Sequence, residues 1–249
     1  MDALVLAAGY ATRLYPLTRD RPKPLLPVGG QPVLGWILDR LALLEDLERV
    51  HVVTNHKFAG HFEDWAGAID FRCPLAVHDD GTLSNDDRLG AVGDMNLVRE
   101  RAGLRDDLLV VAGDNLFDFE LGPLAARSRE LEAPVIGLRE EQDLSAVKKF
   151  GVVDLDEGDR IRELQEKPEQ PKSKLFAICL YFFPRATLSM IARYLEQGHD
   201  PDAPGNYIAW LVRQTACYGY RCPGAWFDIG DHAALQEADA FFSKRRNPC

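Results

Sequence analysis

Residues 4–28 organise this protein, and they read LVLAAGYATRLYPLTRDRPKPLLPV. The opening residues 4–8 are small and apolar without a break, which is typical of a strand buried on both faces of a parallel sheet. At Gly9 the apolar run stops, and a loop begins that contains a hydroxyl, an arginine and a lysine. Because ligands of open α/β sheets bind beyond the carboxyl ends of the strands, the sequence predicts a ligand site at this loop.

The composition of the loop favours a polyphosphate as that ligand. Ala8 and Gly9 carry little or no side chain, so backbone N–H groups there can approach a ligand closely. Arg13 and Lys23 supply positive charge in a segment that four prolines make stiff. The alternative is a solvated charged loop, since Asp20 lies among the basic residues. The loop matches neither G-x-x-x-x-G-K-[ST] nor G-x-G-x-x-G, which argues against a P-loop and against a dinucleotide site.

The bulk composition indicates a globular protein and argues against a general binder of nucleic acid or anionic membranes. The 249 residues are 46% hydrophobic and carry a net charge of −10, whereas binders of nucleic acid or anionic membranes need a basic face. The five cysteines, the last of them Cys249, show no C-x-x-C spacing, so neither a zinc site nor a disulfide framework is indicated. No basic segment precedes the first apolar run, which is too short to span a bilayer. We therefore expect a cytoplasmic protein.

Strand and helix patterns alternate along most of the chain. Strands are expected at about 4–8, 50–54, 74–77, 108–115, 134–138, 150–154, 161–165, 176–183 and 217–222, and helices at about 33–47, 58–66, 121–132, 187–197, 207–214 and 232–244. A further helix is expected to follow the polar segment 78–94 and to end at about residue 101. This rhythm predicts an α/β fold, a three-layer Rossmann-like doubly wound sheet that is mixed but mostly parallel. We expect a single domain over 1–249, with a nucleotide-binding half to about residue 140 and an acceptor-binding half from about 141.

Two further positions are candidates from residue type. Asp114 ends the apolar strand 108–115, again where an open sheet binds its ligand. An Asp there often caps a helix, but the next helix is expected to begin only near residues 119–121. Gly90 lies within the polar segment 78–94, where a nucleobase could lie against backbone. The alternative for that segment is an acidic surface loop followed by a capped helix.

The loop motifs resemble the signature of the sugar-phosphate nucleotidyltransferases (nucleotide-sugar pyrophosphorylases), in a short form like the glucose-1-phosphate thymidylyltransferases. The resemblance is carried by TRLYPLT at 12–18 and PKPLLPV at 22–28, and resumes at GDN 113–115, FGVV 150–153, EKP 166–168, LYFF 180–183 and WFDIG 226–230. Ala11 stands where the family has a second glycine, which adds strain if the site needs a positive φ. Cys179 also replaces a usual glycine, and no glutamine precedes Gly90.

The resemblance implies a fold of the nucleotide-diphospho-sugar transferase type and a Mg²⁺-dependent transfer of a nucleoside monophosphate from an NTP to a sugar 1-phosphate, with release of pyrophosphate. It implies catalytic roles for Arg13 and Lys23, Mg²⁺ ligation by Asp114 and Asp228, nucleotide binding by Ala8, Gly9, Thr12, Asn85 and Gly90, and acceptor binding by Gly151, Glu166, Lys167 and Tyr181. No protein nucleophile is required for such a reaction, and none is evident in the sequence.

Three other interpretations remain open at this point. The acceptor could be phosphocholine or a phosphonate used with CTP. An A-type glycosyltransferase would share the sheet, but residues 114–116 read DNL instead of the Asp-x-Asp that such an enzyme needs. A catalytically inactive, nucleotide-binding regulatory relative is disfavoured by the intact charged residues. The base, the sugar and the choice between monomer and homodimer stay undetermined. Because the sequence ends soon after its last helix, we expect no appended acyltransferase or effector module.

Overall fold

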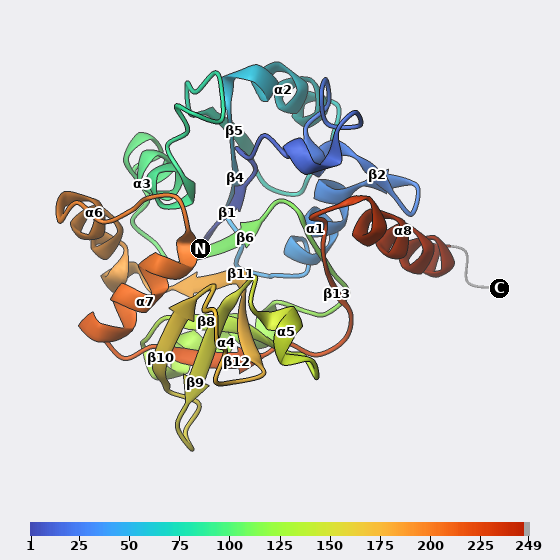
Figure 1. Ribbon diagram of the computed structural model, residues 1–249. Helices are drawn as coiled ribbons and strands as arrows, with labels where there is room; N and C mark the ends of the chain where they lie inside the picture. The colour runs from blue at the N-terminus through green and yellow to red at the C-terminus, as the bar shows by residue number, and fades with distance from the viewer. Residues whose placement is uncertain (247–249) are drawn as a thin grey trace. The chain divides into compact units, whose positions relative to one another are not determined.

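A computed structural model describes residues 1–246, and their contacts form two compact units (Figure 1). Unit 1 contains Met1–Asp2, Leu89–Val110 and Gly122–Pro223, whereas unit 2 contains Ala3–Arg88, Val111–Leu121 and the chain from Gly224 onward. Each unit therefore combines segments that lie far apart in the sequence. The expected division into a nucleotide-binding and an acceptor-binding half near residue 140 stays a prediction.

Unit 2 is built on the first apolar run. Strand β1 (Asp2–Leu6) lies between β4 (Arg49–Thr54) and the end of β6 (Leu108–Ala112), and β5 (Leu75–Asp79) pairs with β4 in parallel. Ala3, Leu4 and Val5 are fully buried in this sheet. Helix α2 (Ala59–Gly67) packs against β5, and α1 (Val33–Leu41) packs against β7 (Asn115–Phe117).

Two short ladders complete unit 2. Strand β7 pairs antiparallel with β13 (Trp226–Asp228), so the chain after residue 224 returns to the end of β6. Strands β2 (Pro27–Val28) and β3 (Gln31–Pro32) form a second two-stranded ladder. Helix α8 (His232–Arg246), dark red in Figure 1, packs against β2 and β13. These contacts bring the C-terminal segment beside the signature loop.

Unit 1 is built around the long strand β11 (Leu175–Phe183). It pairs antiparallel with β8 (Val135–Glu140) and β9 (Gly151–Leu155), while β10 (Ile161–Glu166) pairs with β9, and β12 (Tyr218–Arg221) runs parallel to β8. Helix α4 (Gly122–Leu131) packs on β8 and β11, and α7 (Pro204–Gln214) packs on β10. Helix α3 (Ala91–Arg101) contacts α6 (Ser189–Glu196) and α7.

The expected α/β fold with a mixed sheet is confirmed, and most differences are at element ends. The helix expected over 33–47 ends at Leu41. The apolar pattern continues beyond that residue because successive turns also bury Leu44 and Leu47, at a spacing close to that of a helix. The sequence reading missed α5 (Leu144–Val147) and the β7–β13 ladder, which are too short for a periodic signal. Within residues 1–246, no helix has the length and apolar character needed to cross a membrane.

Candidate functional site

The signature loop after β1 is held in a defined conformation. Ala11 adopts φ 48° and ψ 41°, the left-handed region, immediately before the short 3₁₀ helix η1 (Thr12–Leu14). The fully buried Thr18 hydroxyl donates a hydrogen bond of 2.7 Å to the Ala11 carbonyl. The Ala8 carbonyl accepts another, of 2.9 Å, from the side-chain amide of Asn55. Gly9 is exposed and borders open space. The turn therefore presents bare backbone at the carboxyl end of β1.

Ala11→Gly is expected to stabilise the protein. A left-handed Cβ costs roughly 1–2 kcal/mol, and the extra chain entropy of glycine offsets about half of that gain. The net gain of about 0.5–1 kcal/mol corresponds, for a chain of this size, to a rise in Tm of about 1–4 °C. The measurement is thermal unfolding of both proteins, with Ala68→Gly as the control, because Ala68 is exposed and has an ordinary φ of −93°. A lower Tm for Ala11→Gly would contradict the prediction, whereas Ala68→Gly should lower it.

An ion pair connects the signature loop to the end of β6. Lys23 begins the 3₁₀ helix η2 (Lys23–Leu25), and its ammonium lies 2.5 Å from Oδ2 of Asp114. The loop reaches this position because residue 113 lacks a side chain: a Cβ on Gly113 would lie 2.9 Å from the carbonyl oxygen of Leu6 and 3.1 Å from the ring of Pro24. Gly113 thus permits the close approach of the Pro-Lys-Pro segment.

The environment of Asp114 keeps its carboxylate ionised. Burial alone would raise the pKa of Asp114, but the Lys23 ammonium and the hydrogen bonds from Lys23 and Asn115 outweigh it and lower the pKa below 3.8. The Asn115 side-chain amide donates to Oδ1 of Asp114 over 2.9 Å. Both carboxylate oxygens are therefore held by cationic or amide donors at neutral pH.

The β7–β13 ladder brings Asp228 to the same region of unit 2. Asp228 is opposite Asn115 in the register, and the backbone N–H of Ile229 donates to the Asp114 carbonyl over 3.0 Å. A Cβ placed on Gly230 would lie 3.7 Å from Oδ2 of Asp228 and 4.0 Å from Nη1 of Arg13. The structure thus brings Arg13 and Asp228 to a common point, and Lys23 to Asp114.

The donor chemistry of this cluster fits a magnesium ion. Mg²⁺ is held in proteins by one or two carboxylates together with substrate phosphates and water, and Asp114 and Asp228 offer two carboxylates on adjoining backbone segments. Among residues 1–246, no group of three or more His, Cys, Asp or Glu side chains forms a site that protein ligands alone could complete.

The predicted acceptor residues lie together in unit 1. Gly151 on β9 is opposite Glu166 at the end of β10, and Ala177 of β11 is opposite Gly151. The Glu166 side chain is only 15% exposed, and its Oε1 lies 3.5 Å from the Lys167 ammonium, which is mostly in solvent. Burial raises the pKa of Glu166, although Lys167 opposes that shift. Lys167 has a φ of 46°, so the backbone turns sharply where β10 ends.

Tyr181 is a buried member of the same group. Burial raises the pKa of Tyr181 well above 10, and the neighbouring Cys179 and Glu166 add to the shift. The phenol therefore stays neutral and can act as a hydrogen-bond donor. Cys179, which replaces the glycine usual in the family, lies beside this hydroxyl. Like Cys73, Cys217 and Cys222 it forms no disulfide, and Cys249 lies outside the described residues.

Asn85 and Gly90 fall in different units. Asn85 is exposed in unit 2, and its carbonyl accepts a 2.6 Å hydrogen bond from Arg88. Gly90, in unit 1, has a φ of 79°, and a Cβ there would meet Asp202 and the Pro201 carbonyl at 2.6 Å. The left-handed φ and the close packing against Pro201 and Asp202 are therefore sufficient to explain a glycine at position 90.

Hydrogen bonds of Tyr10 and Asn115 hold the site in place, and neither residue was a sequence-based candidate. The buried Tyr10 hydroxyl forms a hydrogen bond of 3.1 Å with Thr82, and this contact connects the signature loop to the segment 79–87. The side-chain oxygen of Asn115 accepts from the indole of Trp226 over 2.9 Å, which orients the amide toward Asp114. The GDN motif was the available signal for Gly113 and Asn115. No local pattern marks Tyr10.

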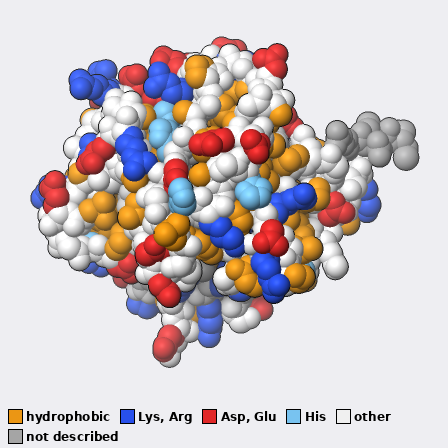
Figure 2. All heavy atoms as spheres, turned by 90° about the horizontal axis from the view of Figure 1, so that it is seen from above, with side chains coloured by type: hydrophobic (Ala, Val, Ile, Leu, Met, Phe, Trp, Pro, Cys, Tyr) orange, Lys and Arg blue, Asp and Glu red, His pale blue; other side chains and the backbone are white. Residues whose placement is uncertain are grey.

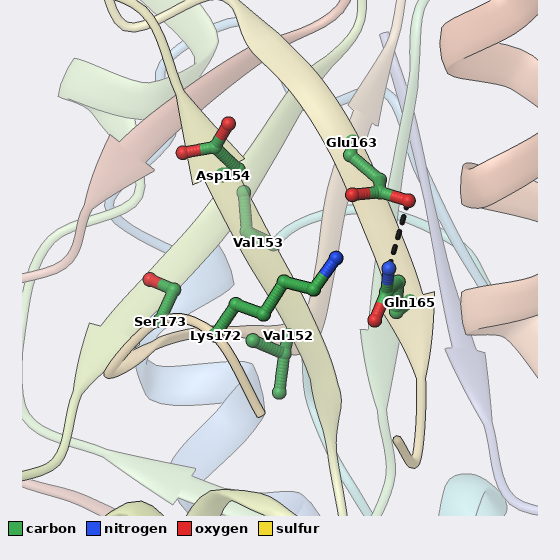
Figure 3. Close-up of a pocket in the computed structure, with 7 residues that line it drawn as sticks. All are labelled: Val152, Val153, Asp154, Glu163, Gln165, Lys172 and Ser173. Carbon is green, nitrogen blue, oxygen red and sulfur yellow. Dashed lines mark hydrogen bonds between the residues drawn. The ribbon is translucent and has the colours of Figure 1, made fainter. Parts of the chain in front are cut away.

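A separate small cavity of about 220 Å³ opens on the β9–β10 hairpin (Figure 3). Figure 3 shows the Lys172 side chain extending across β9 toward Glu163 and Gln165, among side chains of mixed charge. None of the predicted site residues lines this cavity. Figure 2 likewise shows basic side chains interspersed with acidic ones on the face that it presents.

Comparison with known proteins agrees with the motifs. A model of the nucleotidyl transferase family matches residues 2–245. A UTP–glucose-1-phosphate uridylyltransferase, AglF, of Haloferax volcanii is 32% identical over 248 residues, which cover 96% of this chain and 95% of that protein. The bifunctional protein GlmU of Methanocaldococcus jannaschii is 27% identical over 99% of this chain, but the chain spans only 55% of the length of that relative.

Solved structures show the same fold. A UDP-glucose pyrophosphorylase complexed with UDP-glucose superposes with a TM-score of 0.82 at 18% identity, over 98% of this chain and 99% of that chain. A glucose-1-phosphate thymidylyltransferase from Bacillus anthracis, described as putative in its own report, gives a TM-score of 0.78 at 23% identity, over 98% and 95% of the two chains. At these identities the similarity concerns the fold.

Proposed function

The chain belongs to the nucleotidyl transferase family, and from that premise we propose that it transfers a nucleoside monophosphate from an NTP to a sugar 1-phosphate and releases pyrophosphate. The relative AglF, which is named a UTP–glucose-1-phosphate uridylyltransferase, supports this class of reaction. The observation that carries the proposal is the charge cluster in unit 2, where Lys23 contacts Asp114 and where Arg13 and Asp228 approach Gly230.

The chemical difficulty of this reaction is electrostatic. An oxygen of the acceptor phosphate attacks the α-phosphorus, the bond from that phosphorus to the bridging oxygen breaks, and pyrophosphate leaves. Both reactants are polyanions, so catalysis consists of positioning and charge neutralisation and needs no protein nucleophile. In this proposal the planar guanidinium of Arg13 binds the triphosphate and the departing pyrophosphate. The compact ammonium of Lys23 neutralises charge at the α-phosphate.

The turn after β1 contributes neutral donors to the triphosphate. Backbone at Gly9 borders open space, Ala8 before it is half-buried, and Thr12 is exposed at the start of η1. Asp114 and Asp228 would hold Mg²⁺, which when bound supplies positive charge to phosphate oxygens. In the free enzyme Lys23 neutralises Asp114 instead, and we expect this ammonium to turn toward phosphate when the nucleotide binds.

The acceptor is assigned to the group in unit 1. The Glu166 carboxylate accepts hydrogen bonds from sugar hydroxyls, and the exposed Lys167 ammonium binds the acceptor phosphate. Gly151 leaves room for the sugar to lie against the backbone. The neutral Tyr181 hydroxyl donates a hydrogen bond to the acceptor. We propose a cytoplasmic setting.

A panel of substrates tests the proposal. The purified chain is incubated with Mg²⁺, each of ATP, CTP, GTP, UTP and dTTP, and each of glucose 1-phosphate, mannose 1-phosphate, phosphocholine and a phosphonate. We expect pyrophosphate release with at least one sugar 1-phosphate, together with a nucleoside diphosphate sugar identified by mass. Turnover only with CTP and phosphocholine or the phosphonate would replace the acceptor class. Free nucleoside diphosphate would mark a glycosyltransferase, and binding without turnover would contradict an enzymatic role.

A further inference from the structure

The carboxylate of Glu166 occupies space that a side chain at position 205 would need. Gly205 is the second residue of α7, and a Cβ there would lie 1.8 Å from Oε2 and 2.7 Å from Cδ of Glu166. The φ of Gly205 is not in the left-handed region, so backbone conformation does not demand glycine. Within a helix, glycine is less favourable than alanine by about 1 kcal/mol. The contact with Glu166 is therefore the physical reason for glycine at this position.

A second glycine lies on another side of the same oxygen. A Cβ on Gly151, which is opposite Glu166 in the β9–β10 register, would lie 3.1 Å from Oε2. The other oxygen, Oε1, faces the Lys167 ammonium at 3.5 Å. One carboxylate oxygen is thus enclosed by backbone from β9 and α7, and the other points toward the exposed lysine.

We propose that Gly205 is a positioning residue for the acceptor: by lacking a side chain, it lets the first turn of α7 hold the Glu166 carboxylate where that carboxylate binds sugar hydroxyls. This role rests on the proposed function. With alanine at position 205, Glu166 must move by on the order of 1.5 Å to regain an ordinary contact distance. Displacements of that size in a substrate-positioning group change catalytic parameters by up to about a hundredfold.

Steady-state kinetics of Gly205→Ala test the proposal. The KM for the sugar 1-phosphate is expected to rise by about tenfold or more, because a charge-assisted hydrogen bond is lost or misdirected. The KM for the NTP should stay within about twofold of the wild-type value. Gly122→Ala is the matched control: it is in the first position of α4 in the same unit, and a Cβ there meets nothing within 4 Å. Thermal unfolding of each variant establishes that it is folded.

A double-mutant cycle with Glu166→Asp separates positioning from a general effect on α7. Aspartate is shorter by one methylene group, so it leaves room for the methyl group at position 205. Adding Gly205→Ala to Glu166→Asp should therefore change kcat/KM for the acceptor by less than about threefold, against about tenfold or more in the wild-type background. If α7 were merely destabilised, the effect would be equal in both backgrounds and the proposal would fail. An unchanged acceptor KM in a folded Gly205→Ala protein would also overturn it.

The two proposals fail in different ways. An active wild-type enzyme with a Gly205→Ala variant that behaves like Gly122→Ala removes the role of Gly205 and leaves the proposed function intact. A wild-type protein that releases no pyrophosphate with any substrate of the panel overturns the function, and the acceptor role of Gly205 with it.

Discussion

Lys23→Met is expected to lower kcat by about 100- to 1,000-fold, the usual loss when one preorganised donor to developing charge is removed. Methionine keeps most of the length of the side chain and removes only the ammonium, which in the free protein lies 2.5 Å from Asp114. The KM for the NTP should change much less, because the loss concerns the transition state. The measurement is pyrophosphate release under saturating substrates.

The stability of this variant needs its own control, since Lys23 also neutralises Asp114. Without the ammonium the pKa of Asp114 rises, and the largely buried carboxylate is left with one partner fewer, at a cost of about 1–3 kcal/mol. The double variant Lys23→Met with Asp114→Asn removes both charges, and we expect it to regain stability but not activity. Lys148→Met changes an exposed lysine and should leave kcat within about twofold. Near-normal kcat in Lys23→Met would refute the role of Lys23.

Asp228→Asn is expected to have an effect of similar size. The amide preserves the volume of the side chain and the β7–β13 pairing opposite Asn115, so the change is confined to charge. If Asp228 is a metal ligand, kcat should fall by about a hundredfold or more at a fixed low Mg²⁺ concentration. Titration with Mg²⁺ should show a half-saturating concentration that is higher by at least about tenfold. For the wild type, EDTA should abolish turnover and added Mg²⁺ should restore it.

The matched control is Asp231→Asn, the same substitution three residues after Asp228. Asp231 accepts a hydrogen bond of 2.9 Å from the backbone N–H of Ala234 at the start of α8. Asparagine caps helices as well as aspartate does, so Asp231→Asn should leave kcat and the Mg²⁺ titration within about twofold of wild type. An Asp228→Asn enzyme with an unchanged Mg²⁺ requirement would exclude Asp228 from the metal site.

Much of the architecture was predictable from local patterns. Strand β6 is a continuous apolar run, and its burial on both faces requires helices around the sheet. The family, too, was identified from short motifs, and the match over residues 2–245 confirms it. These features depend on residue type within a window of a few positions, which is why they could be read without coordinates.

The predictions failed where a feature depends on contacts between distant segments. Strand β13 has three residues and exists through its pairing with β7, more than a hundred residues earlier. The start of α7 was expected at residue 207, but the helix begins at Pro204, a residue that suits a first turn. From the sequence, strain at Ala11 was predicted only for the case in which that residue has a positive φ. The φ of 48° shows that the turn does adopt the left-handed conformation.

Residue types and their order along the chain were therefore sufficient for the α/β class, the family and the set of charged candidates, because each of these is encoded within a few neighbouring positions. The pairing of Lys23 with Asp114 across 91 residues, the approach of Asp228 and Arg13 to Gly230, and the fit of the Glu166 carboxylate against Gly205 came from the folded chain alone. Their physical basis is close packing and strand register, which arise only when segments remote in sequence are brought into contact.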